Sequence, residues 1–63
     1  MMHQFIYELF RRAAKSDKKQ CVEEKIEKEA ERVGAAVTIA FIYYSFTRDL
    51  ERAYKRFIEE VCG

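Results

Sequence analysis

The chain has 63 residues, and its 12 Lys and Arg residues nearly balance its 11 Asp and Glu residues. A chain of this length makes one domain, residues 1–63, and buries so small a share of its surface on folding that it is only marginally stable alone. Small domains usually gain that support from disulfides, a metal or oligomerisation. Two cysteines and one histidine give neither a disulfide-rich scaffold nor a zinc site. Of these three supports, we therefore expect oligomerisation.

Helix breakers are nearly absent, because the chain has no proline and only two glycines, Gly34 and Gly63. This composition favours an all-α protein. The abundance of Glu, Lys and Arg, together with the absence of asparagine, is also typical of hyperthermophilic proteins. The N-terminus lacks the basic segment and long apolar segment of a signal peptide, so we expect a cytoplasmic protein.

Two short helices are expected first, over about 2–15 and about 18–33. The first has a bulky apolar stripe, and the turn after it is expected at Ser16–Asp17, where Asp17 and Gln20 have the spacing of a capping box. The second has only a thin stripe of small apolar residues, and its outer face is charged. The stripe of the first helix consists of Phe5, Ile6, Leu9, Phe10 and Ala13.

The segment 33–46 contains no charged residue. It is too short to span a membrane, which needs about 20 apolar residues. Its spacing continues into the residues that follow, so we expect one long helix over about 35–62, after a helix end at Gly34. One alternative is a break near 45–47, where Thr47 would cap a separate final helix. Another is an α+β fold in which residues 35–44 form a strand paired across an oligomer.

A long third helix would project beyond the rest of the chain and expose its apolar stripe. Such a stripe is expected to pack on another copy, as in a coiled-coil-like helical bundle, and a homodimer is favoured. An acidic stripe at residues 23–31 and a basic stripe at residues 48–56 are positioned to pair between two chains. The predicted oligomer interface is Ile39, Tyr43, Phe46, Leu50, Tyr54, Phe57, Ile58 and Val61.

The two cysteines lie far apart in this predicted arrangement. The rise of the long helix places Cys62 about 22 Å beyond the level of Cys21, and a disulfide requires Cα atoms within about 7 Å. We therefore expect free thiols, and the alternative is a disulfide between two chains.

No catalytic or cofactor motif occurs in the chain, and His3 stands alone near the N-terminus. We expect no enzyme, no cofactor and no bound metal. The sequence predicts a homo-oligomeric interaction module, which serves as an adaptor, regulator or inhibitor of a larger protein assembly. The alternative function is a nucleic-acid-binding regulator. Its contacts, or those to a protein partner, would be Arg11, Arg12, Lys15, Lys18, Lys19, Arg48, Arg52 and Arg56.

Overall fold

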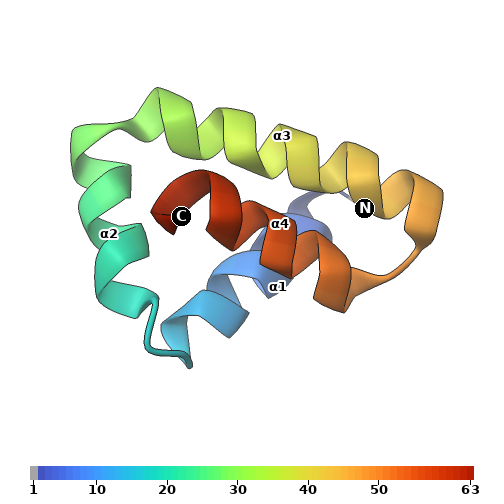
Figure 1. The fold of residues 1–63 in the computed structure, drawn as a ribbon, viewed down its shortest axis with the longest axis horizontal. Helices are drawn as coiled ribbons and strands as arrows, with labels where there is room; N and C mark the ends of the chain where they lie inside the picture. The colour runs from blue at the N-terminus through green and yellow to red at the C-terminus, as the bar shows by residue number, and fades with distance from the viewer. Residues whose placement is uncertain (1) are drawn as a thin grey trace.

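The computed structural model describes residues 2–63, which form four α-helices and no strand. These are α1 (Met2–Ala14), α2 (Lys19–Lys28), α3 (Ala30–Thr47) and α4 (Leu50–Cys62). Helices α3 and α4 lie side by side in opposite directions, α1 passes behind α4, and α2 lies across one end of the pair (Figure 1). The predicted all-α class is confirmed, and residues 35–44 are helical here. Assembly with further copies stays a prediction.

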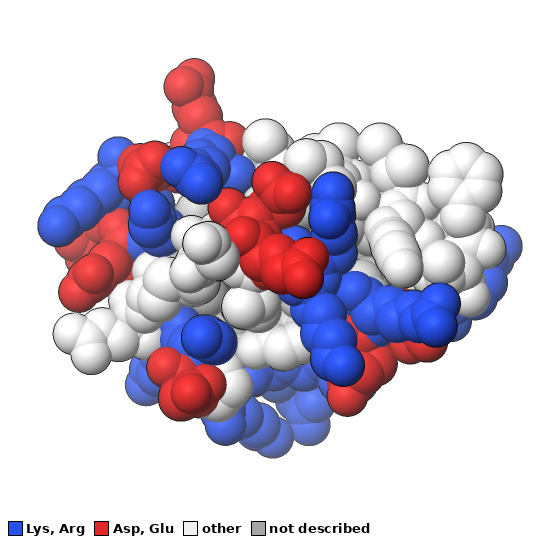
Figure 2. All heavy atoms as spheres, in the orientation of Figure 1, with Lys and Arg blue, Asp and Glu red and all other residues white. Residues whose placement is uncertain are grey.

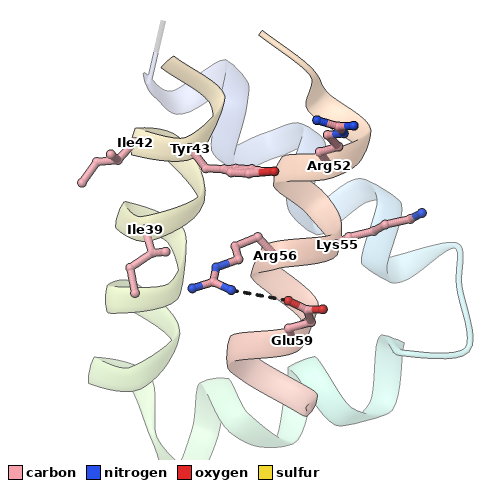
Figure 3. Close-up of a pocket in the computed structure, with 7 residues that line it drawn as sticks. All are labelled: Ile39, Ile42, Tyr43, Arg52, Lys55, Arg56 and Glu59. Atoms are coloured by element: carbon pink, nitrogen blue, oxygen red, sulfur yellow. Dashed lines mark ion pairs between the residues drawn. The ribbon is translucent and has the colours of Figure 1, made fainter. Parts of the chain in front are cut away.

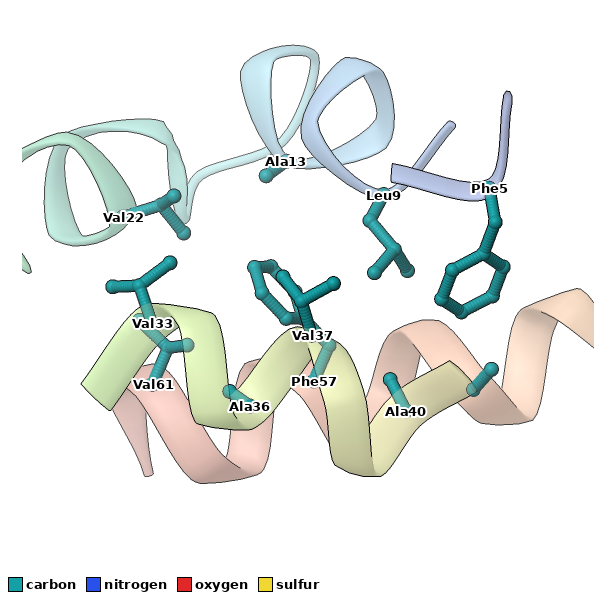
Figure 4. Packing of buried hydrophobic residues seen from close by; sticks show 11 residues of the cluster. Phe5, Leu9, Ala13, Val22, Val33, Ala36, Val37, Ala40, Phe57 and Val61 are labelled. Carbon is teal, nitrogen blue, oxygen red and sulfur yellow. The ribbon is translucent and has the colours of Figure 1, made fainter. Parts of the chain in front are cut away.

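The core is built from one face of each helix (Figure 4). Helices α1 and α4 each contribute three buried residues at four-residue spacing, which places them on a single helical face. Helix α3 contributes four small or medium side chains, whereas α2 contributes only Val22. The buried residues are Phe5, Leu9, Ala13, Val22, Val33, Ala36, Val37, Ala40, Ala53, Phe57 and Val61.

Aromatic side chains join the helices at the edges of this core. The Phe5 ring of α1 lies 5.3 Å from that of Phe41 and 5.2 Å from that of Tyr44, both on α3. The rings of Phe10 and Phe57 meet edge to face at 5.5 Å and join α1 to α4. Such pairs stabilise by about 0.5–1.5 kcal/mol beyond their buried area. The aromatic stripe predicted for the first helix is therefore part of the core.

The long helix expected over residues 35–62 is wrong. The chain turns at Arg48 and Asp49, so this segment is two helices that pack against each other. The apolar stripe expected to project from the chain folds back onto it, and the side chains of Phe57 and Val61 are buried. The projecting stripe on which the assembly prediction rested is therefore not part of the fold.

Two hydrogen bonds fix this turn. Arg48 adopts the left-handed conformation, with φ 57°, and its N–H donates to the carbonyl of Tyr44 at 2.7 Å, which ends α3. The carboxylate of Asp49 accepts a hydrogen bond at 3.2 Å from a backbone N–H in the first turn of α4. The alternative break near 45–47 was close to this position, but the cap is Asp49 rather than Thr47.

The break between the second and third helices lies at Glu29, and not at Gly34 as expected from the sequence. Glu29 has φ −140° and ψ 57°, whereas Gly34 lies inside α3. Lys25 donates to the Glu29 carboxylate at 3.0 Å, and Arg32 lies 3.6 Å from it. The Lys25 hydrogen bond and these charges hold the pKa of Glu29 below its ordinary value. No helix-breaking residue stands at this junction, so the sequence carries no local signal for it.

The predicted turn at Ser16–Asp17 is present, but the capping box is not formed. Helix α2 is preceded by Lys18, and no side chain caps it. The Ser16 hydroxyl instead donates to the carbonyl of Ala13 at 2.9 Å and accepts from the N–H of Lys18 at 3.0 Å. It also lies 3.2 Å from the Tyr54 hydroxyl. Ser16 therefore both shapes the turn and ties it to α4.

Cys21 and Cys62 form a disulfide, with their Cα atoms 6.2 Å apart. The predicted free thiols are wrong because the separation was calculated along one continuous third helix. Once the chain folds back after α3, the end of α4 returns to the start of α2. The bond holds α2 against α4, which matters because Val22 is the only residue that α2 buries.

Candidate functional site

One surface of α3 is exposed and yet uncharged. We call it the outer face of α3. No charged residue occurs between Arg32 and Arg48, and Figure 2 shows an uncharged region over the C-terminal half of this helix. The side chains of Phe46, Ile42 and Ile39 are 84%, 53% and 37% exposed. The outer face consists of Gly34, Ala35, Thr38, Ile39, Ile42, Ser45 and Phe46.

This surface offers few polar groups to water. The hydroxyl of Thr38 donates to the carbonyl of Gly34 at 3.1 Å, and that of Ser45 donates to the carbonyl of Phe41 at 2.9 Å. Both hydroxyls thus bond within their own helix. The opposite side of α3 is buried in the core, so the helix is apolar on nearly all sides. A helix of this kind is normally covered on both sides.

A hollow lies between the outer face and α4 (Figure 3). Its α3 wall is apolar and aromatic. Its α4 wall is mainly cationic, with one carboxylate. The lining residues are Ile39, Ile42, Tyr43, Arg52, Lys55, Arg56 and Glu59.

The cationic wall is partly neutralised by its own helix. Arg56 lies 3.6 Å from the carboxylates of both Glu59 and Glu60, and Arg52 lies 3.7 Å from that of Asp49. These side chains are exposed, so each pair contributes about 0–1 kcal/mol to stability. The wall can therefore exchange these local pairs for contacts with a charged partner at little cost.

A second hollow flanks the outer face on the side of α1 and α2. It is almost wholly apolar, and Gly34 and Thr38 form part of its α3 wall. A Cβ atom added to Gly34 would meet no other atom within 4 Å, so the space above this glycine is open. The N-terminal half of the outer face is therefore low and adjoins an apolar depression, whereas Ile42 and Phe46 stand out from the C-terminal half.

The residues predicted to form an oligomer interface divide into three groups. Ile39 and Phe46 are exposed on the outer face. Phe57 and Val61 are fully enclosed by their own chain and are not available to a partner. The remaining four are half-buried: Tyr43, Leu50, Tyr54 and Ile58.

The basic residues predicted to contact nucleic acid or a partner lie in two segments, 11–19 and 48–56, and the fold brings these segments together. The Ser16–Tyr54 contact brings the turn before α2 to α4, so that Lys18 and Lys55 line one hollow. Arg12 of α1 makes an ion pair with Glu51 of α4 at 2.6 Å. The residues predicted around the first turn thus adjoin α4, which carries Arg52 and Arg56. Arg11 pairs with Glu8 at 3.4 Å, and Lys15, Lys19 and Arg48 are exposed.

The predicted interface omitted five residues of the outer face, namely Gly34, Ala35, Thr38, Ile42 and Ser45. The heptad spacing selected only one edge of the outer face, since it followed the residues that continue into α4. The uncharged stretch itself was the available signal. An α-helix of this length without a charge on any side has an apolar outer face wherever its core side lies.

Residues 2–63 contain no group of three His, Cys, Asp or Glu side chains that could hold a metal ion. No polar or charged side chain among these residues is buried, and His3 is exposed near the start of α1. In the part of the chain that the structure describes, no helix combines the length and apolar character needed to cross a bilayer. The outer face of α3 and its flanking hollows are therefore the surface that most needs an explanation.

No protein-family model matches the chain, and comparisons with curated proteins and with solved structures find no similar protein.

Proposed function

We propose that this chain is a non-enzymatic interaction module that self-associates through the outer face of α3 and serves as an adaptor or regulator of a larger protein assembly. One observation carries the proposal: three large apolar side chains, Ile39, Ile42 and Phe46, are exposed on one uncharged helical face. Apolar surface of this kind is stabilised when another apolar surface covers it. A second copy is always present at the same concentration, and closed dimers are the commonest such assembly.

The first test is the mass in solution of the wild-type chain and of Ile42→Lys. Wild type is expected to sediment with the mass of two chains at micromolar concentration. Ile42 lies on the side of α3 opposite the buried residues Val33, Val37 and Ala40, so a lysine there would place a charge in the interface without disturbing the core. We expect the dimer dissociation constant to rise by about tenfold or more.

The matched control is Tyr7→Lys, because Tyr7 is an exposed aromatic residue of α1, 64% exposed and outside the outer face. This variant should keep the wild-type mass. A wild-type chain that stays monomeric over the micromolar range would contradict the proposal, as would equal effects of the two lysines.

The cytoplasmic location expected from the sequence stays a prediction, and the disulfide bears on it. Structural disulfides persist in oxidising compartments, and they also occur in the intracellular proteins of hyperthermophiles. The composition is of the hyperthermophilic kind. A cytoplasmic location is therefore consistent with the disulfide if the host is a hyperthermophile.

Nucleic-acid binding is a second candidate, and one observation favours it: Lys18 and Lys55, which are far apart in the chain, line the same hollow, together with Asp17 and Glu59. If this surface binds phosphates, affinity for random-sequence DNA or RNA should fall steeply as salt rises. Charge reversal at Lys18 and Lys55 together should weaken binding and reduce the salt dependence, whereas Lys28→Glu on α2 should not. The absence of salt-sensitive binding by wild type would remove this candidate.

A further inference from the structure

The outer face of α3 differs in size between its two halves. Its N-terminal half carries Gly34, Ala35 and Thr38, with open space above the glycine. Its C-terminal half carries Ile42 and Phe46, and the Phe46 side chain is 84% exposed. One half is thus a depression and the other a protrusion. The large half of one copy can lie against the small half of another only if the two α3 helices run in opposite directions.

The charges around α3 have the same asymmetry. Residues 20–33, which lead into its N-terminal half, contain five glutamates and three basic residues. Residues 48–56, which follow its C-terminal end, contain four basic residues and two acidic ones. Glu31 and Arg32 are exposed just before the N-terminal end of the uncharged face, where Arg32 pairs with Glu29 at 3.6 Å, and Arg48 is exposed just beyond its C-terminal end. Antiparallel copies place each acidic end beside a basic end, whereas parallel copies would place like charges together.

From these two asymmetries we infer that the outer face of α3 is covered by a second copy of this chain in antiparallel orientation, with Phe46 of each copy over Ala35 of the other. The inference rests on the proposed self-association and adds its orientation and register.

The spacing of residues on the outer face allows one register to form the proposed contacts at both ends of the interface. Four residues, about 6 Å of helix, separate Ala35 from Ile39 and also separate Ile42 from Phe46. When Ile39 lies beside Ile42 of the other copy, Ala35 consequently lies beside Phe46 of the other copy. The two-fold symmetry repeats each contact, so the interface is closed after two chains. Antiparallel helix dipoles are also favourable.

An isotope-filtered NOE experiment on an equal mixture of ¹³C-labelled and unlabelled wild-type protein tests this arrangement. Contacts between chains are expected from the Phe46 ring to the Ala35 methyl group and from Ile39 to Ile42. A dimer with contacts from Phe46 to Phe46, or with contacts away from α3, would overturn the inference but leave self-association intact. A monomer would overturn the proposed function as well, so the two failures are distinguishable.

A size exchange supplies a second readout that does not depend on NMR. Ala35→Phe alone is expected to raise the dimer dissociation constant by about tenfold or more, because two large rings then occupy the same space. Adding Phe46→Ala should restore most of the affinity, because the large ring then lies at position 35 and the small side chain at position 46. Both residues are exposed in the single chain, so circular dichroism should show unchanged folding. Failure of the double variant to recover would contradict the register.

Discussion

Removal of the Cys21–Cys62 disulfide is expected to lower the free energy of unfolding by about 4 kcal/mol. The bond joins residues 41 positions apart, and closing a loop of that length removes about this much conformational entropy from the unfolded chain. The total stability of a chain of 63 residues is of the order of 3–9 kcal/mol. The loss is therefore comparable with the whole stability, and the reduced chain should be largely unfolded at elevated temperature.

Urea unfolding followed by circular dichroism measures this effect. Wild type under oxidising conditions should unfold at a much higher urea concentration than Cys21→Ser with Cys62→Ser. A reducing agent should lower the wild-type midpoint to that of the double variant and leave the double variant unchanged. Equal midpoints for oxidised and reduced wild type would show that the bond does not stabilise the fold.

Truncation of the central aromatic residue, Phe57→Ala, is expected to cost about 3–5 kcal/mol. The Phe57 side chain is 0% exposed and packs edge to face against Phe10. Its removal leaves a cavity between α1 and α4, because the disulfide and the turn at Asp49 hold both ends of α4 and limit its movement. We expect the variant to be unfolded or only partly folded at room temperature.

The matched control is Tyr7→Ala, which removes an exposed aromatic ring from α1 and should change the unfolding free energy by no more than about 0.5 kcal/mol. Both variants should be compared with wild type by urea unfolding at one protein concentration, since self-association would make stability depend on concentration. A similar small loss for both variants would mean that Phe57 is not the centre of the core.

The sequence predicted the helical class and the first helix well, because these depend on spacing within one segment. The apolar residues from Phe5 to Ala13 are spaced so that they lie on one face of a helix. The structure buries this face. The breaks at Glu29 and Arg48 were harder to predict. Neither position holds glycine or proline, and Arg48 adopts a left-handed conformation that is uncommon for arginine. Such breaks are determined by packing between helices, which a local pattern does not contain.

One wrong helix boundary accounts for the wrong prediction of free thiols. The distance between Cys21 and Cys62 was calculated along a continuous helix, whereas the fold-back brings the two residues together. The same boundary explains why Phe57 and Val61 were assigned to an interface between chains. Their spacing correctly indicated an apolar face, but the face packs on its own chain. The uncharged segment was recognised from the sequence, and only the structure shows which of its sides is exposed.

The disulfide also changes the connectivity of the molecule. Residues 21–62 form a closed covalent ring, and α1 with the turn after it is a branch outside that ring. A single backbone cut within the ring, for example in the turn between α3 and α4, leaves the two pieces joined. Of the four helices, only α1 can separate from the core without stretching the ring. Local opening of this protein is therefore expected to begin with α1, and it would uncover the rings of Phe41, Tyr44 and Phe57, which α1 contacts.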